Sequence, residues 1–132
     1  MCNRPKKKPE RTQVGAWGEA IAARYLAERG YTVRDRNWRA GHGELDIVAE
    51  CADVLIFVEV RVRRSDQFGT PEESLTARKR AKLIETAQAY LQAHELFDRH
   101  WQIDVIAIEM DHRNAVKRLE HYKCAVEGAS NS

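Results

Sequence analysis

Apolar residues recur at helical spacing in two segments of the chain. In residues 13–29 they are spaced by three or four positions, which predicts an amphipathic helix that ends before Gly30. The same spacing predicts a second helix that ends near residue 94. Its start is open between Thr70, which precedes a proline and two acids, and Thr76, because both fit the N-cap of a helix.

The other apolar segments have the character of strands. Residues 43–50 alternate between apolar and polar side chains, which is typical of a strand. Residues 54–62 are almost wholly apolar, so we expect a strand that is covered on both faces. Further strands are predicted at residues 31–38, at residues 101–109 and, at a sheet edge, at residues 116–121.

This order of elements predicts a single α/β domain with a mixed central sheet flanked by helices, in the order αβββαβ with the edge strand last. A length of 132 residues is that of one domain. We expect the domain to span residues 13–123. A flexible basic arm is expected at residues 1–12 and a tail at residues 124–132.

Charge is distributed unevenly along the chain. The net charge is only +2, and residues 1–13 hold five basic side chains and one acidic one. The surplus therefore comes from the arm, which can add non-specific attraction to nucleic acid. No apolar run approaches the ~20 residues of a membrane-spanning helix. Three widely spaced cysteines favour a reducing cytoplasm.

Two acidic residues interrupt the apolar strands. Glu59 lies in the most apolar segment of the chain, where a carboxylate is costly unless it is paired or bound to a metal. If Ala52 and Asp53 form a two-residue turn, the register places Asp46 opposite Glu59. Two opposed carboxylates repel each other, and a Mg²⁺ or Mn²⁺ ion between them removes that repulsion.

A cation accompanies these acids. Arg61 lies two residues after Glu59 and therefore on the same face of the strand, where it can hold a phosphate. The pattern predicts a metal or phosphate site. The alternative is a structural arrangement in which Glu44 pairs with Arg61, and Asp46 or Glu59 is protonated or paired with a basic group elsewhere. Glu19, on the first helix, joins the site only if that helix packs beside the two strands; otherwise it is a solvated helix acid.

A family resemblance covers nearly the whole domain. It is carried by Lys79 and by residues 17–31, 36–50, 57–75 and 102–108. The most specific part is the sequence G-E-L-D followed by F-V-E-V-R-V-R. In that order and spacing the chain resembles the YraN-like family of uncharacterised bacterial proteins. The fold of that family is the PD-(D/E)XK nuclease fold, similar to archaeal Holliday-junction resolvases, so the resemblance implies a single restriction-endonuclease-like domain.

The resemblance also implies an activity, which is metal-dependent hydrolysis of DNA phosphodiester bonds, with branched or damaged DNA as candidate substrates. Asp46 and Glu59 match the two acids of the nuclease motif and would bind Mg²⁺ or Mn²⁺. Glu19 resembles an acid of the first helix that often acts through a water molecule. Arg61 stands where these nucleases have a lysine. Arginine can hold a phosphate but handles protons poorly, because it is essentially always charged.

Nucleic-acid contacts are expected from Arg63, Arg64 and Lys79, and Lys79 is also a candidate to replace the missing lysine. Because junction resolvases are dimers, the resemblance implies a homodimer. Two alternatives stay open. One is a non-catalytic nucleic-acid-binding protein that keeps the nuclease fold, which the arginine at position 61 favours. The other is a protein-interaction adaptor without affinity for DNA.

Overall fold

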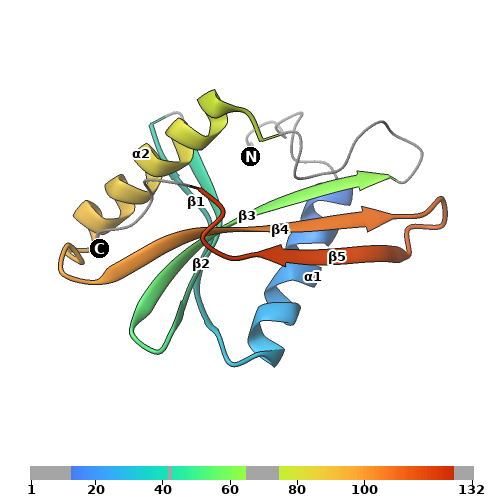
Figure 1. Cartoon of the computed structure of the whole chain (residues 1–132), viewed down its shortest axis with the longest axis horizontal. Helices are drawn as coiled ribbons and strands as arrows, with labels where there is room; N and C mark the ends of the chain where they lie inside the picture. The colour runs from blue at the N-terminus through green and yellow to red at the C-terminus, as the bar shows by residue number, and fades with distance from the viewer. Residues whose placement is uncertain (1–12, 42, 65–74, 127–132) are drawn as a thin grey trace, which may run out of the picture.

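The computed structural model describes residues 13–41, 43–64 and 75–126. These residues form an α/β fold in the order αβββαββ, which confirms the predicted order and adds the expected edge strand (Figure 1). The helices are α1 (Gln13–Glu28) and α2 (Ala77–Ala93). The strands are β1 (Thr32–Ala40), β2 (Gly43–Cys51), β3 (Val54–Arg64), β4 (His100–Met110) and β5 (Val116–Tyr122).

The five strands form one mixed sheet in the order β1-β2-β3-β4-β5. Neighbouring strands are antiparallel except β3 and β4, which are parallel. A parallel pair needs a long crossover, and the segment that contains α2 supplies it. The parallel strands β3 and β4 are the most apolar ones, as expected for strands that are covered on both faces.

Each helix covers one face of the sheet (Figure 1). On one face, Leu83, Ala87 and Tyr90 of α2 pack against alternate strand residues such as Phe57. On the other face, the buried side of α1 packs against the intervening strand residues, among them Val58. Because strand side chains alternate between faces, each residue of β3 is assigned to one helix or the other.

The helix ends follow from local chemistry. Gly30 has φ +91°, and the N–H of Tyr31 donates to the carbonyl of Leu26 at 3.0 Å, which is the expected glycine-closed helix end. α2 begins after Thr76, whose hydroxyl accepts a hydrogen bond from the Lys79 N–H at 3.2 Å. The competing start at Thr70 lies outside the described residues.

Both helices approach the sheet through a glycine. A Cβ on Gly18 of α1 would collide with the side chain of Val62 on β3. A Cβ on Gly43 of β2 would collide with the hydroxyl of Thr86 on α2. The absence of a side chain at these two positions therefore sets the distance between each helix and the sheet.

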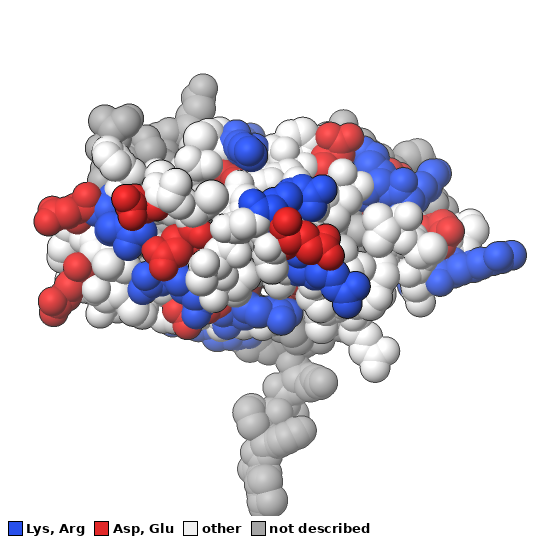
Figure 2. Space-filling view, turned by 90° about the horizontal axis from the view of Figure 1, so that it is seen from below, with Lys and Arg blue, Asp and Glu red and all other residues white. Residues whose placement is uncertain are grey.

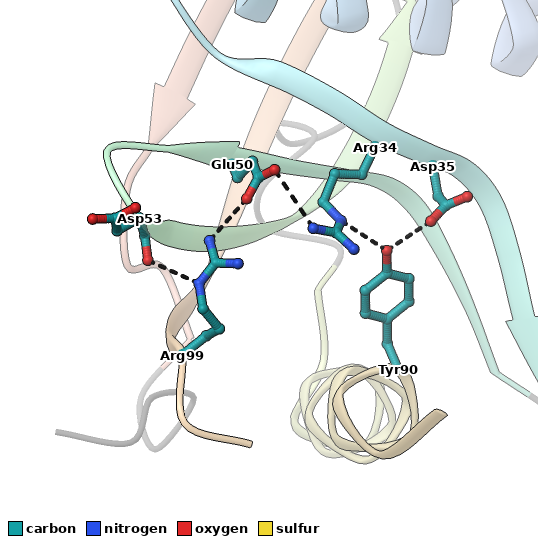
Figure 3. Close-up of polar contacts among 6 residues, drawn as sticks. All are labelled: Arg34, Asp35, Glu50, Asp53, Tyr90 and Arg99. Carbon is teal, nitrogen blue, oxygen red and sulfur yellow. Dashed lines mark hydrogen bonds and ion pairs between the residues drawn. The ribbon is translucent and has the colours of Figure 1, made fainter. Parts of the chain in front are cut away.

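A polar network holds α2 against the β1–β2 half of the sheet (Figure 3). The Tyr90 hydroxyl donates to Asp35 at 2.6 Å and accepts from Arg34 at 3.2 Å. Glu50 on β2 joins Arg34 to Arg99, with N–O distances of 3.5 and 2.8 Å. Because Tyr90 is fully buried, its hydroxyl depends on these partners for hydrogen bonding.

The packed domain continues past residue 123, where we expected it to end. The N–H of Cys124 donates to Asp104 and that of Ala125 donates to Ile103, both at 2.9 Å. Val126 is buried in the core. Residues 1–12, expected to form an arm, lie outside the described residues. Within the described ranges, no helix is long and apolar enough to cross a membrane.

Candidate active site

Asp46 and Glu59 come together where β2 and β3 separate. Ala52 and Asp53 form the predicted two-residue turn, both with positive φ, and the predicted register holds from Cys51 to Ile47. Regular pairing then ends, one residue before Asp46 would face Glu59. The Asp46 carboxylate accepts a hydrogen bond from the Val60 N–H at 2.8 Å instead. A side chain thus replaces a backbone partner, and this fixes the carboxylate between the two strands.

Burial perturbs both carboxyl groups, and the charge of Glu59 adds to the effect on Asp46. Desolvation, followed by the charge of Glu59, raises the pKa of Asp46 well above its usual range. Desolvation also raises the pKa of Glu59, while Arg61 and a hydrogen bond with Asp46 act in the opposite direction. The Glu59 side chain keeps 14% of its surface exposed, so a small ligand can reach it. Strongly perturbed acids at an accessible place are typical of functional sites.

Two cations belong to this site. Arg61 donates from Nη1 to Glu59 Oε2 at 2.9 Å, and both side chains are largely buried. Lys79, exposed on the first turn of α2, lies close enough for its charge to lower the pKa of Glu59. The alternative had paired Glu44 with Arg61; in the structure Glu44 pairs with Arg39 at 3.5 Å, and Arg61 pairs with Glu59. The structure therefore brings Arg61 and Lys79 to Glu59.

Glu19 packs at the same site, because α1 packs beside β2 and β3. This packing was the condition for counting Glu19 among the site residues. Its side chain is buried, and its charge contributes to the raised pKa of Asp46. α1 delivers it because the adjacent Gly18 lets the helix approach β3 closely. The three acids therefore come from α1, β2 and β3.

Asn37 is a site residue that the sequence reasoning missed. Its Nδ2 donates to Glu19 Oε1 at 2.9 Å. The pairing of β1 with β2 places Asn37 opposite Asp46, between two regular residue pairs. Asn37 has φ +54°, a backbone conformation that asparagine tolerates better than most residues. The only sequence signal was an asparagine inside a predicted strand, where that residue type is depleted.

The two arginines after Arg61 lie on opposite faces of the sheet. β3 continues to Arg64, two residues past the predicted end of the strand at residue 62, so both arginines belong to the strand. Arg63 follows Glu59 and Arg61 at two-residue spacing and shares their face. Arg64 donates to the carbonyl of Asp111 at 3.4 Å and lines a hollow beside Trp17 of α1.

Positive charge is concentrated at the start of α2 and is mixed with negative charge elsewhere on the visible surface (Figure 2). On the face seen in Figure 2, the Lys and Arg side chains alternate with Asp and Glu and form no continuous basic field among the described residues. The first turn of α2 is different, because Arg78, Lys79 and Arg80 follow one another and no acid lies in that turn. Cations at the positive end of a helix dipole cost stability, so this cluster is not explained by helix formation.

The comparisons with known proteins identify a family. Residues 18–108 match the uncharacterised protein family UPF0102. The chain belongs to this family.

Curated UPF0102 relatives agree with the match over most of their length. The UPF0102 protein of Roseiflexus castenholzii is 49% identical, and the alignment covers 90% of this chain and 97% of that one. The UPF0102 protein of Moorella thermoacetica is 43% identical, with 87% and 96% covered. The YraN-like resemblance inferred from the motifs is thereby confirmed as membership in UPF0102.

A solved structure, that of Pyrococcus furiosus SfsA in complex with Ca²⁺, is also similar to this UPF0102 protein. The TM-score is 0.34 and the sequences are 16% identical, with 89% of this chain and 65% of that chain covered. The chain thus spans about two thirds of the length of SfsA. A likeness this weak carries no argument about fold or function.

Proposed function

We propose that this UPF0102 protein is a Mg²⁺- or Mn²⁺-dependent nuclease that hydrolyses DNA phosphodiester bonds. The observation that supports this most is the contact between Asp46 and Glu59, two largely buried acids, of which Glu59 is paired with Arg61. Burial makes each of these acids costly to ionise, and the charge of Glu59 adds to that cost for Asp46. A divalent cation and a phosphate would balance their charge.

The donor set fits Mg²⁺ or Mn²⁺. Among the described residues, no group of three or more His, Cys, Asp or Glu side chains is arranged to hold a metal ion. Mg²⁺ does not need such a cage, since it is commonly held by one or two carboxylates together with water and substrate phosphate. Asp46 and Glu59 would be the direct ligands, and Glu19, tethered by Asn37, would act through water.

The chain's own groups would then share the work of phosphodiester hydrolysis. A bound divalent cation supplies a more acidic water and offsets negative charge on the phosphate. The Val60 N–H orients the Asp46 carboxylate, and Arg61 holds Glu59 in place and carries the positive charge that a phosphate would meet. Lys79 is the group near Glu59 that can exchange a proton, which Arg61 cannot do.

Metal binding is the first test. Mn²⁺ would be titrated by calorimetry into the wild type, into Asp46→Asn/Glu59→Gln and into the control Glu85→Gln, which neutralises an exposed acid on α2. Saturable binding by the wild type and the control but not by the double variant supports the proposal. A wild type that binds no Mn²⁺, even with a short branched DNA present, refutes it.

Cleavage of that branched DNA by the same samples tests the reaction itself. We expect cleavage that requires Mn²⁺ or Mg²⁺, is lost in the double variant and is retained in Glu85→Gln. The second candidate function, DNA binding without cleavage, is favoured by Arg61 because its guanidinium is engaged with Glu59 and cannot act as a base. Metal binding and DNA binding without any cleavage would decide for it.

A further inference from the structure

A hollow of about 540 Å³ lies on the α2 face of the sheet. Its apolar lining comes from Leu75, Val105 and Ala125. Tyr122 adds an aromatic side chain, and Arg80 and Lys123 add two positive charges. Among the described residues that line it there is no Asp or Glu. The hollow is large enough for a small organic ligand and is suited to one that combines an apolar part with a negative charge.

The hollow adjoins the candidate active site through the sheet. Val105 on β4 pairs with Glu59 on one side and with Tyr122 of β5 on the other. Paired residues of neighbouring strands point to the same face, so Glu59, Val105 and Tyr122 form a row that faces α2. Two strand spacings separate the ends of this row, a distance of ~10 Å between backbones.

The first turn of α2 connects the two places a second time. Lys79 lies within electrostatic reach of Glu59, and the next residue, Arg80, lines the hollow. A negatively charged chain that passes Arg61 and Lys79 would therefore meet Arg80 and Lys123 next. The positive charges lead from the acid pair to the hollow.

Apolar and aromatic side chains edged by cations match the chemistry of a nucleotide. Proteins that bind single-stranded nucleic acid stack bases on aromatic rings and track the phosphates with Lys and Arg. A base inside a duplex cannot enter such a hollow, because it is already stacked and paired. An unpaired base has no such constraint.

We infer that the hollow receives an unpaired nucleotide of the DNA strand whose phosphate lies at Asp46 and Glu59. Its base packs against Tyr122, and its phosphate meets Arg80 and Lys123. This inference rests on the proposed function and narrows its substrate class. The substrate is DNA with unpaired nucleotides beside the cleaved bond, as in gaps, flaps and junctions, and not continuous duplex.

The test measures binding without cleavage. Fluorescence anisotropy in EDTA compares a blunt duplex with the same duplex carrying a three-nucleotide gap. We expect the wild type to prefer the gapped DNA. Tyr122→Leu, which keeps an apolar side chain but removes the ring, should weaken binding of gapped DNA at least about fivefold and leave blunt duplex nearly unchanged. Tyr122→Phe keeps the ring and is expected to keep the preference.

The charges are tested with a matched pair of double variants. Arg80→Gln/Lys123→Gln should weaken binding of gapped DNA. It should also make the slope of log Kd against log salt concentration shallower by about 1.4, because each phosphate contact with single-stranded DNA contributes about 0.7. Arg24→Gln/Lys117→Gln removes the same charge from exposed positions outside the hollow and should do neither. Thermal unfolding of each variant checks that it is folded.

The outcomes separate this inference from the proposed function. If the wild type binds both DNAs equally, or if Tyr122→Leu keeps the preference, the hollow has no such role and metal-dependent cleavage stands on its own test. If the preference for gapped DNA depends on the hollow but Mn²⁺ neither binds nor supports cleavage, the hollow does bind unpaired nucleotides and the nuclease proposal is refuted. A wild type that binds neither DNA overturns the inference about the hollow, and the Mn²⁺ titration and the cleavage assay then decide the nuclease proposal.

Discussion

Replacing Asp46 with asparagine is expected to stabilise the metal-free protein at neutral pH. Burial and then the charge of Glu59 raise the pKa of Asp46, so the folded protein keeps a proton that the unfolded chain has already lost. The folded state binds more protons in that range, and stability therefore falls as pH rises from about 4, the ordinary pKa of aspartate, through the raised folded pKa. Asparagine still offers an oxygen to the Val60 N–H but carries no charge.

The size of the effect follows from the surroundings of the pair. Two unit charges about 4 Å apart repel by about 4 kcal/mol at an effective dielectric constant of 20. Arg61, 2.9 Å from Glu59, offsets part of this, and partial exposure screens more. We therefore expect Asp46→Asn to gain about 1–2 kcal/mol at pH 8 and to raise the Tm by about 3–10 °C in a domain of this size.

The assay is thermal unfolding followed by circular dichroism in EDTA at pH 4, 6 and 8. The difference between Asp46→Asn and the wild type should be near zero at pH 4 and grow with pH, whereas Glu85→Gln should show no such trend. Saturating Mn²⁺ should then stabilise the wild type but not the variant, by about 2.7 kcal/mol at one hundred times the Kd. An asparagine variant that is less stable than the wild type at pH 8, or a difference that ignores pH, would refute the reasoning.

Three further substitutions test the framework. Tyr90→Phe removes a buried hydroxyl bonded to two charged side chains and should lower the free energy of unfolding by about 2–3 kcal/mol in urea titrations; an unchanged value would contradict the network. Gly18→Ala gains about 1 kcal/mol of helix propensity but meets Val62, at a cost of about 1–3 kcal/mol, so urea titrations should show no stabilisation and calorimetry weaker Mn²⁺ binding. Asn37→Gly keeps the left-handed backbone but removes the amide that donates to the buried Glu19; stability should fall by about 1–3 kcal/mol and Mn²⁺ affinity should fall with it, and unaltered affinity would remove Asn37 from the site.

Local sequence signals were enough to predict the elements and one long-range relation. The helices followed from apolar spacing together with the closing Gly30, whereas the start of α2 was left open between Thr70 and Thr76. The register of β2 against β3 followed from a two-residue turn at Ala52 and Asp53, because side-chain alternation leaves little freedom once a hairpin turn is placed. These predictions depend on neighbours in the chain, and the sequence contains them directly.

The arrangement of the site depended on contacts that no local pattern contains. From the sequence, Glu19 was a site residue only if its helix packs beside the two strands. Its position depends on how closely α1 approaches β3 at Gly18. Asn37 was missed because its role appears only when β1 is paired with β2 and the pairing opens opposite Asp46. Nucleic-acid contacts were expected from both Arg63 and Arg64, but the continuation of β3 as a strand places these two side chains on opposite faces of the sheet.

The sequence by itself determined which residues are chemically out of place: two acids in apolar strands, an arginine beside them and a run of cations at the start of a helix. Only the tertiary structure decided which of these meet. It joined acids from α1, β2 and β3, brought the first turn of α2 to Glu59 and formed the hollow between α2, β4 and β5. The physical reason is that burial and the repulsion between charges depend on distances across packed elements, and those distances are set by the sheet register and by the close helix contacts at Gly18 and Gly43.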